Sequence, residues 1–290
     1  MDFEELLDRL WGMDFEQFAH DTLMVVINYR TRERKIFHNA TSNDYQTFID
    51  TYHPIFLTYN GKGYDKYILK GCLLGYSPEE CKEINDFIIV ENRNGWEYPF
   101  DGYCDNVPIW DLMDCIKTFK SLKELEGNAR MNITETTVDF NLPTKWNEQQ
   151  RDEVIYYCTA DVNALFPLFD RLINSYKSKF IICKLGGIDS EWGLCMTDAN
   201  LTATLLKAER VEHDDPFLYE YPKQIDKSKI PAEALEYFDD LIEHNDIEYK
   251  REAPSFKFGD CLVQLGVGGL HGARETTFVY DRGDGLHCEK

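Results

Sequence analysis

Carboxylates in three separate stretches of the sequence are spaced in a way that could hold metal ions. They are Asp14, Glu16, Asp65 and Asp161, with Tyr157 four residues before the last of them. Carboxylates that converge on one site repel one another unless cations lie between them. Oxygen ligands suit magnesium or manganese better than zinc, and a pair of such ions promotes phosphoryl chemistry. The sequence therefore predicts a site for two divalent cations, Mg²⁺ or Mn²⁺.

The first pair of acids lies in a stretch with the period of a β-strand. Asp14 and Glu16 alternate with large apolar residues over residues 11–18. Side chains two positions apart in a strand point to the same face of the sheet. We expect a half-buried strand that presents both carboxylates on one face.

The third acid follows a turn that contains two glycines, residues 59–65, which we call the glycine turn. An apolar run, 54–58, precedes the turn, and a helical pattern over 66–74 follows it. Glycine lets the backbone turn tightly or approach a ligand closely. Asp65 at the start of the helix is expected to cap its N-terminus and to face the end of the strand.

The fourth acid belongs to a helix expected over residues 148–171. Tyr157 and Asp161 are four positions apart, which puts them on one face and one turn from each other. The same spacing is also compatible with a tyrosine in the core and an aspartate in solvent.

The order of the remaining elements predicts a mixed α/β fold. An antiparallel meander should feed a parallel strand, with helices between the later strands. The expected strands are 11–18, 23–29, 35–38, 54–58 and 107–114, and the expected helices include 44–52 and those that start at Ser77 and Ser121. After about residue 175 the alternation ends, and helices are expected over 197–209 and 231–244. We therefore expect one domain over 1–175 and a smaller, mainly helical module over 176–290, which ends in a strand over 262–265 followed by a glycine-rich turn at Gly268 and Gly269.

Composition excludes several classes of protein. The chain has 290 residues, 43% of them hydrophobic, and its nine cysteines include no C-x-x-C pair, which argues against a disulfide scaffold or a structural zinc site. No apolar run approaches the roughly 18 residues of a membrane span, and no signal peptide is visible, so a cytoplasmic protein without a membrane partner is expected. The net charge of −21 argues against indiscriminate nucleic-acid binding but not against an enzyme that holds a strand through cations.

Three motifs in order resemble the DnaQ-like (DEDDy) proofreading 3′–5′ exonucleases of the ribonuclease H-like superfamily. The first is Asp14-Phe15-Glu16, the second is Asn60 followed by Tyr64-Asp65, and the third runs from Tyr157 to Asp161. The resemblance covers roughly residues 8–175. It implies a ribonuclease H-like mixed sheet flanked by helices, and hydrolysis of the 3′-terminal phosphodiester of single-stranded DNA with two metal ions.

The resemblance also implies roles for the individual side chains. Asp14, Glu16 and Asp161 would ligate the more tightly held ion, which carries the attacking water. Asp14 would bridge to the second ion, which Asp65 would hold largely through water, and the Tyr157 hydroxyl would orient the attacking water.

Contacts with the substrate are implied for the residues between the acids. Asn60 and Tyr64 would contact the terminal nucleotide or shape its pocket. Phe15 could stack on a base or point into the core. Asp111 and Asp114 end the expected strand over 107–114, and for them capping or supporting roles are expected.

The C-terminal part resembles the segment that follows the exonuclease domain in phage-type family B DNA polymerases. Gly268 and Gly269 are similar to a glycine pair that contacts the template there, although Leu265-Gly266 stands where that family has its tyrosine. No D-x-x-S-L-Y-P motif of a polymerase palm appears before Lys290. The chain therefore resembles the N-terminal part of such a polymerase without the palm, either a fragment or a short protein, and the implied partners are a DNA 3′ end, a palm domain or replication proteins.

Two other functions remain compatible with the sequence. One is a non-catalytic module of a truncated polymerase that binds nucleic acid or a partner. The other is a stand-alone 3′–5′ ribonuclease, because the motifs discriminate poorly between DNA and RNA.

Overall fold

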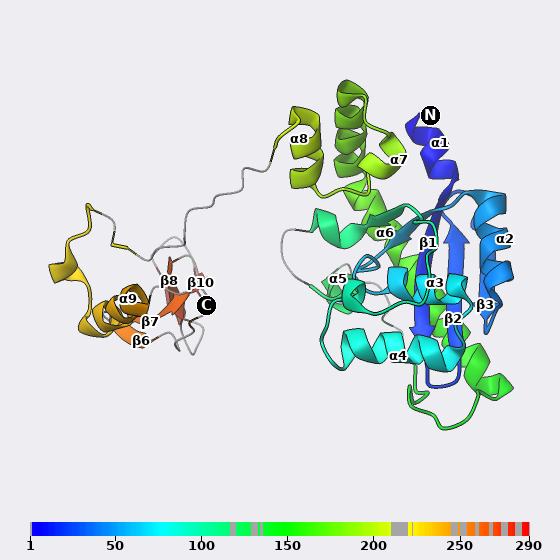
Figure 1. Cartoon of the computed structure of the whole chain (residues 1–290), viewed down its shortest axis with the longest axis horizontal. Helices are drawn as coiled ribbons and strands as arrows, with labels where there is room; N and C mark the ends of the chain where they lie inside the picture. The colour runs from blue at the N-terminus through cyan, green and yellow to red at the C-terminus, as the bar shows by residue number, and fades with distance from the viewer. Residues whose placement is uncertain are drawn as a thin grey trace. The chain divides into compact units, whose positions relative to one another are not determined.

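The computed structural model contains two compact units, Met1–Glu209 and Arg210–Lys290, which we call the N-terminal unit and the C-terminal unit (Figure 1). Each is described by itself. The described residues are 2–116, 120–128, 133, 136–209, 220–221, 223–244, 249, 254–258, 261–266, 269–273, 278–281 and 286–289.

A mixed five-stranded sheet forms the centre of the N-terminal unit. Its strands, in the order β3-β2-β1-β4-β5, are β3 (Arg34–His38), β2 (Thr22–Asn28), β1 (Leu10–Gln17), β4 (Ile55–Thr58) and β5 (Ile109–Asp111). The pairs β3–β2 and β2–β1 are antiparallel, whereas β1–β4 and β4–β5 are parallel. The predicted α/β class and the meander that feeds a parallel strand are confirmed. β5 is shorter than expected because the chain turns into a 3-10 helix, η2 (Leu112–Cys115).

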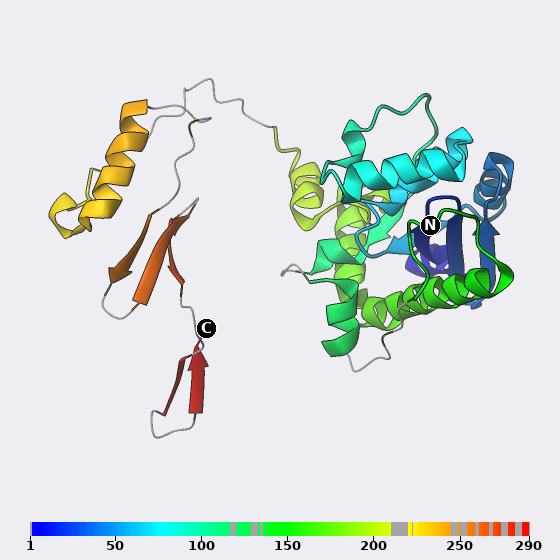
Figure 2. The ribbon, with the colours of Figure 1, turned by 90° about the horizontal axis from the view of Figure 1, so that it is seen from below.

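Helices cover both faces of this sheet (Figure 2). On one face, alternate side chains of β1 and β2 pack with helices α2 (Ser42–Tyr52), α3 (Asp65–Leu74) and α4 (Pro78–Ile89). The core of the other face is built with α1 (Phe3–Asp8), α5 (Leu122–Asn128), α6 (Glu148–Gly186) and α8 (Asp198–Leu206). A four-residue helix, α7 (Ser190–Gly193), packs against α6.

Two of the predicted helix starts are confirmed by their caps. The Ser77 hydroxyl accepts the N–H of Glu80, at 3.3 Å, and the Ser121 hydroxyl accepts the N–H of Glu124, at 3.2 Å. In both cases the glutamate carboxylate accepts the N–H of the serine, which completes a capping box.

Strand β1 is buried on both faces, so the prediction of a half-buried strand is wrong. The reason is the close approach of α6. A Cβ atom added at Gly12 would lie 2.9 Å from Val162 Cγ1 and 3.1 Å from the Phe166 ring. The glycine lets α6 pack directly over β1, which places the acids that follow Gly12 on the same face beneath this helix.

The expected domain boundary near residue 175 falls inside α6, which continues without interruption to Gly186. Helix α8 then packs back on α6, so the compact unit extends to Glu209. A regular helix carries no local signal at residue 175, and the change in composition there marks only the end of the sheet pattern.

The C-terminal unit has more strand than expected. Its described residues contain a 3-10 helix, η3 (Lys227–Lys229), and α9 (Ala232–His244), but also an antiparallel sheet of β6 (Ser255–Phe258), β7 (Cys261–Gly266) and β8 (Gly269–Ala273), and a pair of β9 (Phe278–Asp281) with β10 (Leu286–Glu289). The strand expected just before the glycine pair is present as β7, whereas β6, β9 and β10 were not predicted, because strands of four to six residues are too short to show a clear period. Gly269 begins β8 opposite Gly266, and Gly268 lies outside the described residues.

Among the described residues, no helix combines the length and the apolar composition that a membrane span requires.

Candidate metal-binding site

Four carboxylates meet where β1 passes beneath α6, and we call them the carboxylate cluster: Asp14 and Glu16 of β1, Asp65 of α3 and Asp161 of α6. Ligand atoms of Asp14, Glu16 and the Cys158 thiol all lie within 4.8 Å of one another. The negative charges of Asp65 and Asp161 both raise the pKa values of Asp14 and Glu16. The structure therefore brings together all the acids that the sequence singled out.

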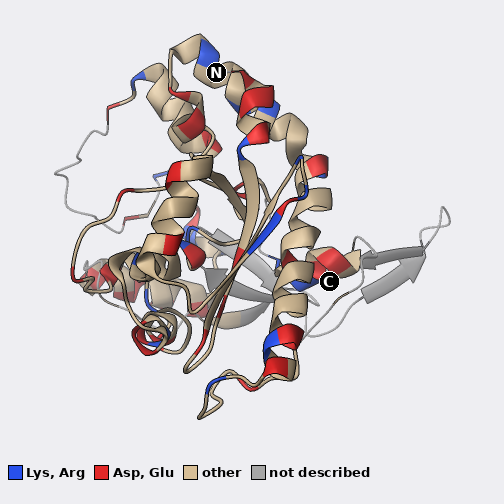
Figure 3. Ribbon diagram, turned by 90° about the vertical axis from the view of Figure 1, so that its right-hand side faces the viewer, with Lys and Arg blue, Asp and Glu red and all other residues tan. Residues whose placement is uncertain are grey.

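Burial and mutual repulsion make this cluster hard to ionise. Burial is the largest cause that raises the pKa values of Asp14 and Glu16 well above normal, and repulsion by the neighbouring carboxylates adds to it. Burial also raises the pKa of Asp65 to about 7, although a backbone N–H bond opposes the shift. Figure 3 shows further acids on helices on both sides of the sheet. Burial and repulsion therefore both favour the protonated forms of these carboxylates.

The donor set fits divalent cations. Most of the available ligand atoms are carboxylate oxygens, which suit Mg²⁺ and Mn²⁺. A cation bound between the carboxylates would also remove the repulsion that raises their pKa values. The thiol of Cys158, 3.4 Å from Asp14 Oδ2, is a softer potential ligand. Cys158 is fully buried in α6 and contacts the cluster from there.

Asp65 does not cap its helix, contrary to the prediction. It is the first residue of α3, and Tyr64, at the cap position, makes no capping bond with its side chain. The Asp65 carboxylate instead accepts the backbone N–H of Phe15 at 3.0 Å. Strand β4 pairs with β1 only as far as Gly12. The edge of β1 beyond Gly12 is therefore open to Asp65, which takes the place of a neighbouring strand.

Asp111 holds the glycine turn in place. Its carboxylate accepts backbone N–H groups of Asn60 at 2.9 Å, Lys62 at 3.0 Å and Met113 at 3.0 Å. The bond to Met113 caps η2, so the predicted capping and supporting role of Asp111 is confirmed. Asp114 also supports the turn, because its carboxylate pairs with the Lys62 ammonium group.

The tight course of the turn depends on Gly61. A Cβ atom at this position would lie 2.4 Å from Thr58 Oγ1, so any larger residue would collide with the end of β4. Gly61 thus allows the backbone of the turn to pass close to Thr58. The preceding residue, Asn60, takes the left-handed conformation, with φ of 62°.

Tyr157 and Asp161 lie on the inner side of α6. Asp161 is only 6% exposed, so the alternative of an aspartate in solvent is wrong. Burial, followed by the nearby charges of Glu16 and Asp161, raises the pKa of the Tyr157 hydroxyl, and a hydrogen bond to Asp161 adds to the shift. The hydroxyl therefore stays protonated and can donate a hydrogen bond at the edge of the cluster.

Lys123 of α5 also reaches the cluster, and no sequence pattern had indicated this contact. Its ammonium group bonds to the Asp161 carboxylate, lies 3.5 Å from Glu126 Oε2 and is 5.0 Å from the centre of the Tyr157 ring. In the sequence, Lys123 belongs to a helix start with a capping box, and that local pattern does not reveal which distant segment the lysine meets.

The residues expected to contact a nucleotide differ in their surroundings. Phe15 is 3% exposed and stacks on Tyr45. It therefore points into the core and is not open to a base. The Tyr64 hydroxyl donates to Asn85 Oδ1 of α4 at 2.8 Å. Asn60 is exposed in the glycine turn, where its side chain is accessible to a ligand.

In comparisons with known proteins, no protein-family model matches the chain, and no curated protein matches it.

Proposed function

We propose that the N-terminal unit is a metal-dependent 3′–5′ exonuclease with a ribonuclease H-like fold, which removes nucleotides from single-stranded DNA ends. The observation that carries the proposal is the buried carboxylate cluster, built from β1, α3 and α6, with Tyr157 beside it. The strand order and directions of the sheet are compatible with this fold. The order of the three sequence motifs supports the same family.

The residues of the cluster have distinct tasks in this proposal. Asp14, Glu16, Asp65 and Asp161 would hold two Mg²⁺ or Mn²⁺ ions. When bound, such ions lower the pKa of a water molecule and stabilise negative charge on the departing oxygen. The protonated Tyr157 hydroxyl orients that water, and Lys123 balances the charge of Asp161 and packs over the Tyr157 ring.

The preference for DNA rests on the C-terminal part of the sequence. Its glycine-rich segment resembles the one that follows the exonuclease domain of phage-type family B DNA polymerases. We therefore propose the 3′ end of single-stranded DNA as the substrate, and a polymerase palm domain or replication proteins as further partners.

The test is hydrolysis of a single-stranded DNA oligonucleotide labelled at its 3′ end, with Mg²⁺ or Mn²⁺. We expect release of the labelled nucleotide by the unaltered chain and none by Asp14→Ala/Glu16→Ala. A matched control is Glu148→Ala/Asp152→Ala, which removes two exposed acids of α6 and should remain active. Hydrolysis that survives in the Asp14/Glu16 variant would overturn the assignment of the site.

A second arm uses the same oligonucleotide made of RNA. Equal hydrolysis of both would favour the ribonuclease alternative over the preference for DNA. Binding without any metal-dependent hydrolysis would favour the non-catalytic module.

A further inference from the structure

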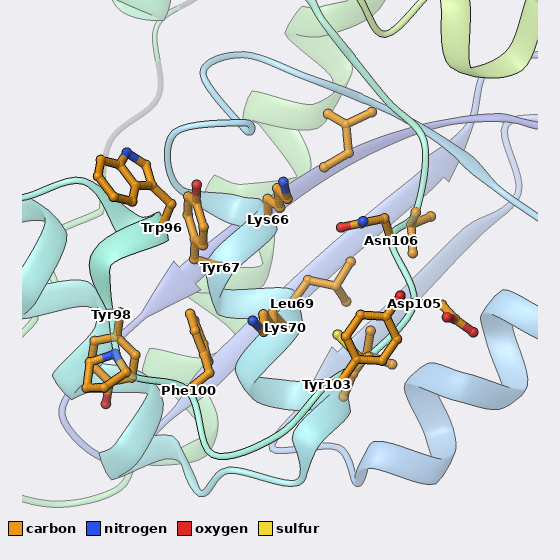
Figure 4. A pocket seen from close by; sticks show the side chains of 15 residues that line it. Lys66, Tyr67, Leu69, Lys70, Trp96, Tyr98, Phe100, Tyr103, Asp105 and Asn106 are labelled. Carbon is orange, nitrogen blue, oxygen red and sulfur yellow. The ribbon is translucent and has the colours of Figure 1, made fainter.

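A groove of about 520 Å³ runs along α3 (Figure 4). One wall is α3 itself, and the other is the segment 96–107, which leads towards β5. The side chains that matter for its chemistry are Lys66, Lys70, Trp96, Phe100 and Tyr103. We call it the α3 groove.

Ring and backbone contacts near Phe100 hold segment 96–107 against α3 and its neighbours. A Cβ atom added at Gly95 would lie 2.2 Å from the Tyr67 ring, so only glycine allows this approach. Phe100 stacks between Tyr67 and Tyr76, with ring centres 6.4 Å and 6.2 Å away. The Tyr76 hydroxyl also accepts the N–H of Asp101 at 2.7 Å.

The acid Asp105 also lines the groove, but no ion pair joins it to Lys66 or Lys70. Although the chain has a net charge of −21, neither Lys66 nor Lys70 forms an ion pair among the described residues. Lys70 Nζ lies 4.2 Å from the centre of the Phe100 ring, and Lys66 Nζ lies 5.7 Å from that of Tyr67. Residues four apart on a helix share a face, so the two ammonium groups present positive charge along one side of the groove.

Large aromatic side chains are exposed beside these lysines. Trp96 is 69% exposed and Tyr103 is 80% exposed. Proteins bind single-stranded nucleic acid by combining lysines or arginines along the backbone with aromatic rings on which the bases stack. This combination of unpaired lysines and open rings matches that ligand chemistry.

We infer that the α3 groove binds a few nucleotides of single-stranded nucleic acid, upstream of the 3′ end that reaches the carboxylate cluster. Lys66 follows Asp65 directly at the start of α3, so one end of the groove lies one residue along the chain from the cluster. The inference rests on the proposed exonuclease function for the placement of the 3′ end. The affinity of the groove for a strand can be measured without hydrolysis.

The test measures binding of a twelve-nucleotide oligothymidylate, labelled with fluorescein at its 5′ end, by anisotropy in EDTA at low salt. The full chain is compared with Lys66→Gln/Lys70→Gln and with Trp96→Ala. The control Lys177→Gln/Lys184→Gln removes the same charge from exposed positions of α6. We expect Trp96→Ala to lose at least about fivefold in affinity, since one stacked base contributes this much. The lysine variant should also lose affinity, most strongly at low salt, because it lacks two phosphate contacts.

The salt dependence separates direct phosphate contacts from a general change in charge. Loss of two contacts should make the slope of log K against log salt shallower by about 1.4, whereas the control should keep the slope of the unaltered chain. Equal affinity of the groove variants and the control would overturn the inference, and so would a lack of binding by the unaltered chain at low salt.

Hydrolysis measured in parallel distinguishes the groove from the proposed function. We expect the groove variants to raise KM for the twelve-nucleotide strand while hydrolysis of a trinucleotide, too short to fill the groove, is unchanged. Metal-dependent hydrolysis with unchanged affinities refutes the groove alone. Loss of affinity in the groove variants of a chain that does not hydrolyse DNA refutes the exonuclease alone.

Discussion

Asp65 should make the stability of the metal-free chain fall as the pH rises. It is 4% exposed, and burial raises its pKa from 3.8 to about 7. Between these two values the folded chain keeps the proton and the unfolded chain releases it. The contribution to the free energy of unfolding is therefore complete below pH 4 and is lost as the pH rises to about 7. About three pKa units, at about 1.36 kcal/mol each, correspond to about 4 kcal/mol.

The assay is urea denaturation in EDTA from pH 4 to pH 8, with Asp65→Asn as the reference. The amide keeps an oxygen for the N–H of Phe15 but does not titrate. Relative to this variant, the unaltered chain should lose about 4 kcal/mol of stability between the two ends of the range. The charge of Asp65 also raises the pKa values of Asp14 and Glu16. This effect adds to the loss of stability that the unaltered chain shows relative to the variant as the pH rises.

Divalent cations should reverse the loss. At pH 8, Mg²⁺ or Mn²⁺ at a hundred times its dissociation constant should raise the free energy of unfolding by about 2.7 kcal/mol. The increase should be smaller in Asp65→Asn. The argument from burial is refuted if, in EDTA, the free energies of unfolding of the unaltered chain and of Asp65→Asn differ by an amount that stays constant within about 1 kcal/mol from pH 4 to pH 8.

Three further substitutions test the contacts around the cluster, each by urea denaturation. Lys123→Gln removes the cation that contacts Asp161 and should cost about 1–2 kcal/mol in EDTA, with a smaller loss in Mn²⁺, which supplies positive charge; equal losses would contradict this. Asp111→Asn replaces one accepting oxygen by an NH₂ group that faces a backbone N–H of the glycine turn, so the free energy of unfolding should fall by about 1–3 kcal/mol. An unchanged urea midpoint would argue against the role of Asp111. Gly12→Ala should cost about 1–3 kcal/mol, because its methyl group meets Val162, and a neutral effect would show that α6 shifts easily.

The elements that position the acids could be predicted because their signals are local. Alternation placed Asp14 and Glu16 on one face, and helical spacing placed Tyr157 one turn from Asp161. The capping residues Ser77 and Ser121 marked helix starts correctly for the same reason, since a cap involves only the first turn of its helix.

The features that were missed depend on contacts between distant segments. The contact of Lys123 with Asp161 joins residues 38 positions apart. The bond from Phe15 to Asp65 depends on where β4 stops pairing with β1, and no pattern within either strand shows that. The burial of β1 on both faces likewise depends on α6, which packs over Gly12 from a position about 150 residues later.

The packing of α6 on β1 also determines when the carboxylate cluster forms during folding. Asp14 and Asp161 are brought together only after a very long loop has closed, which is entropically costly before native contacts offset it. During synthesis, Asp14, Glu16 and Asp65 leave the ribosome well before Asp161. Three of the four cluster acids are therefore made before the fourth, and the carboxylate cluster is complete only late, when α6 docks on the sheet.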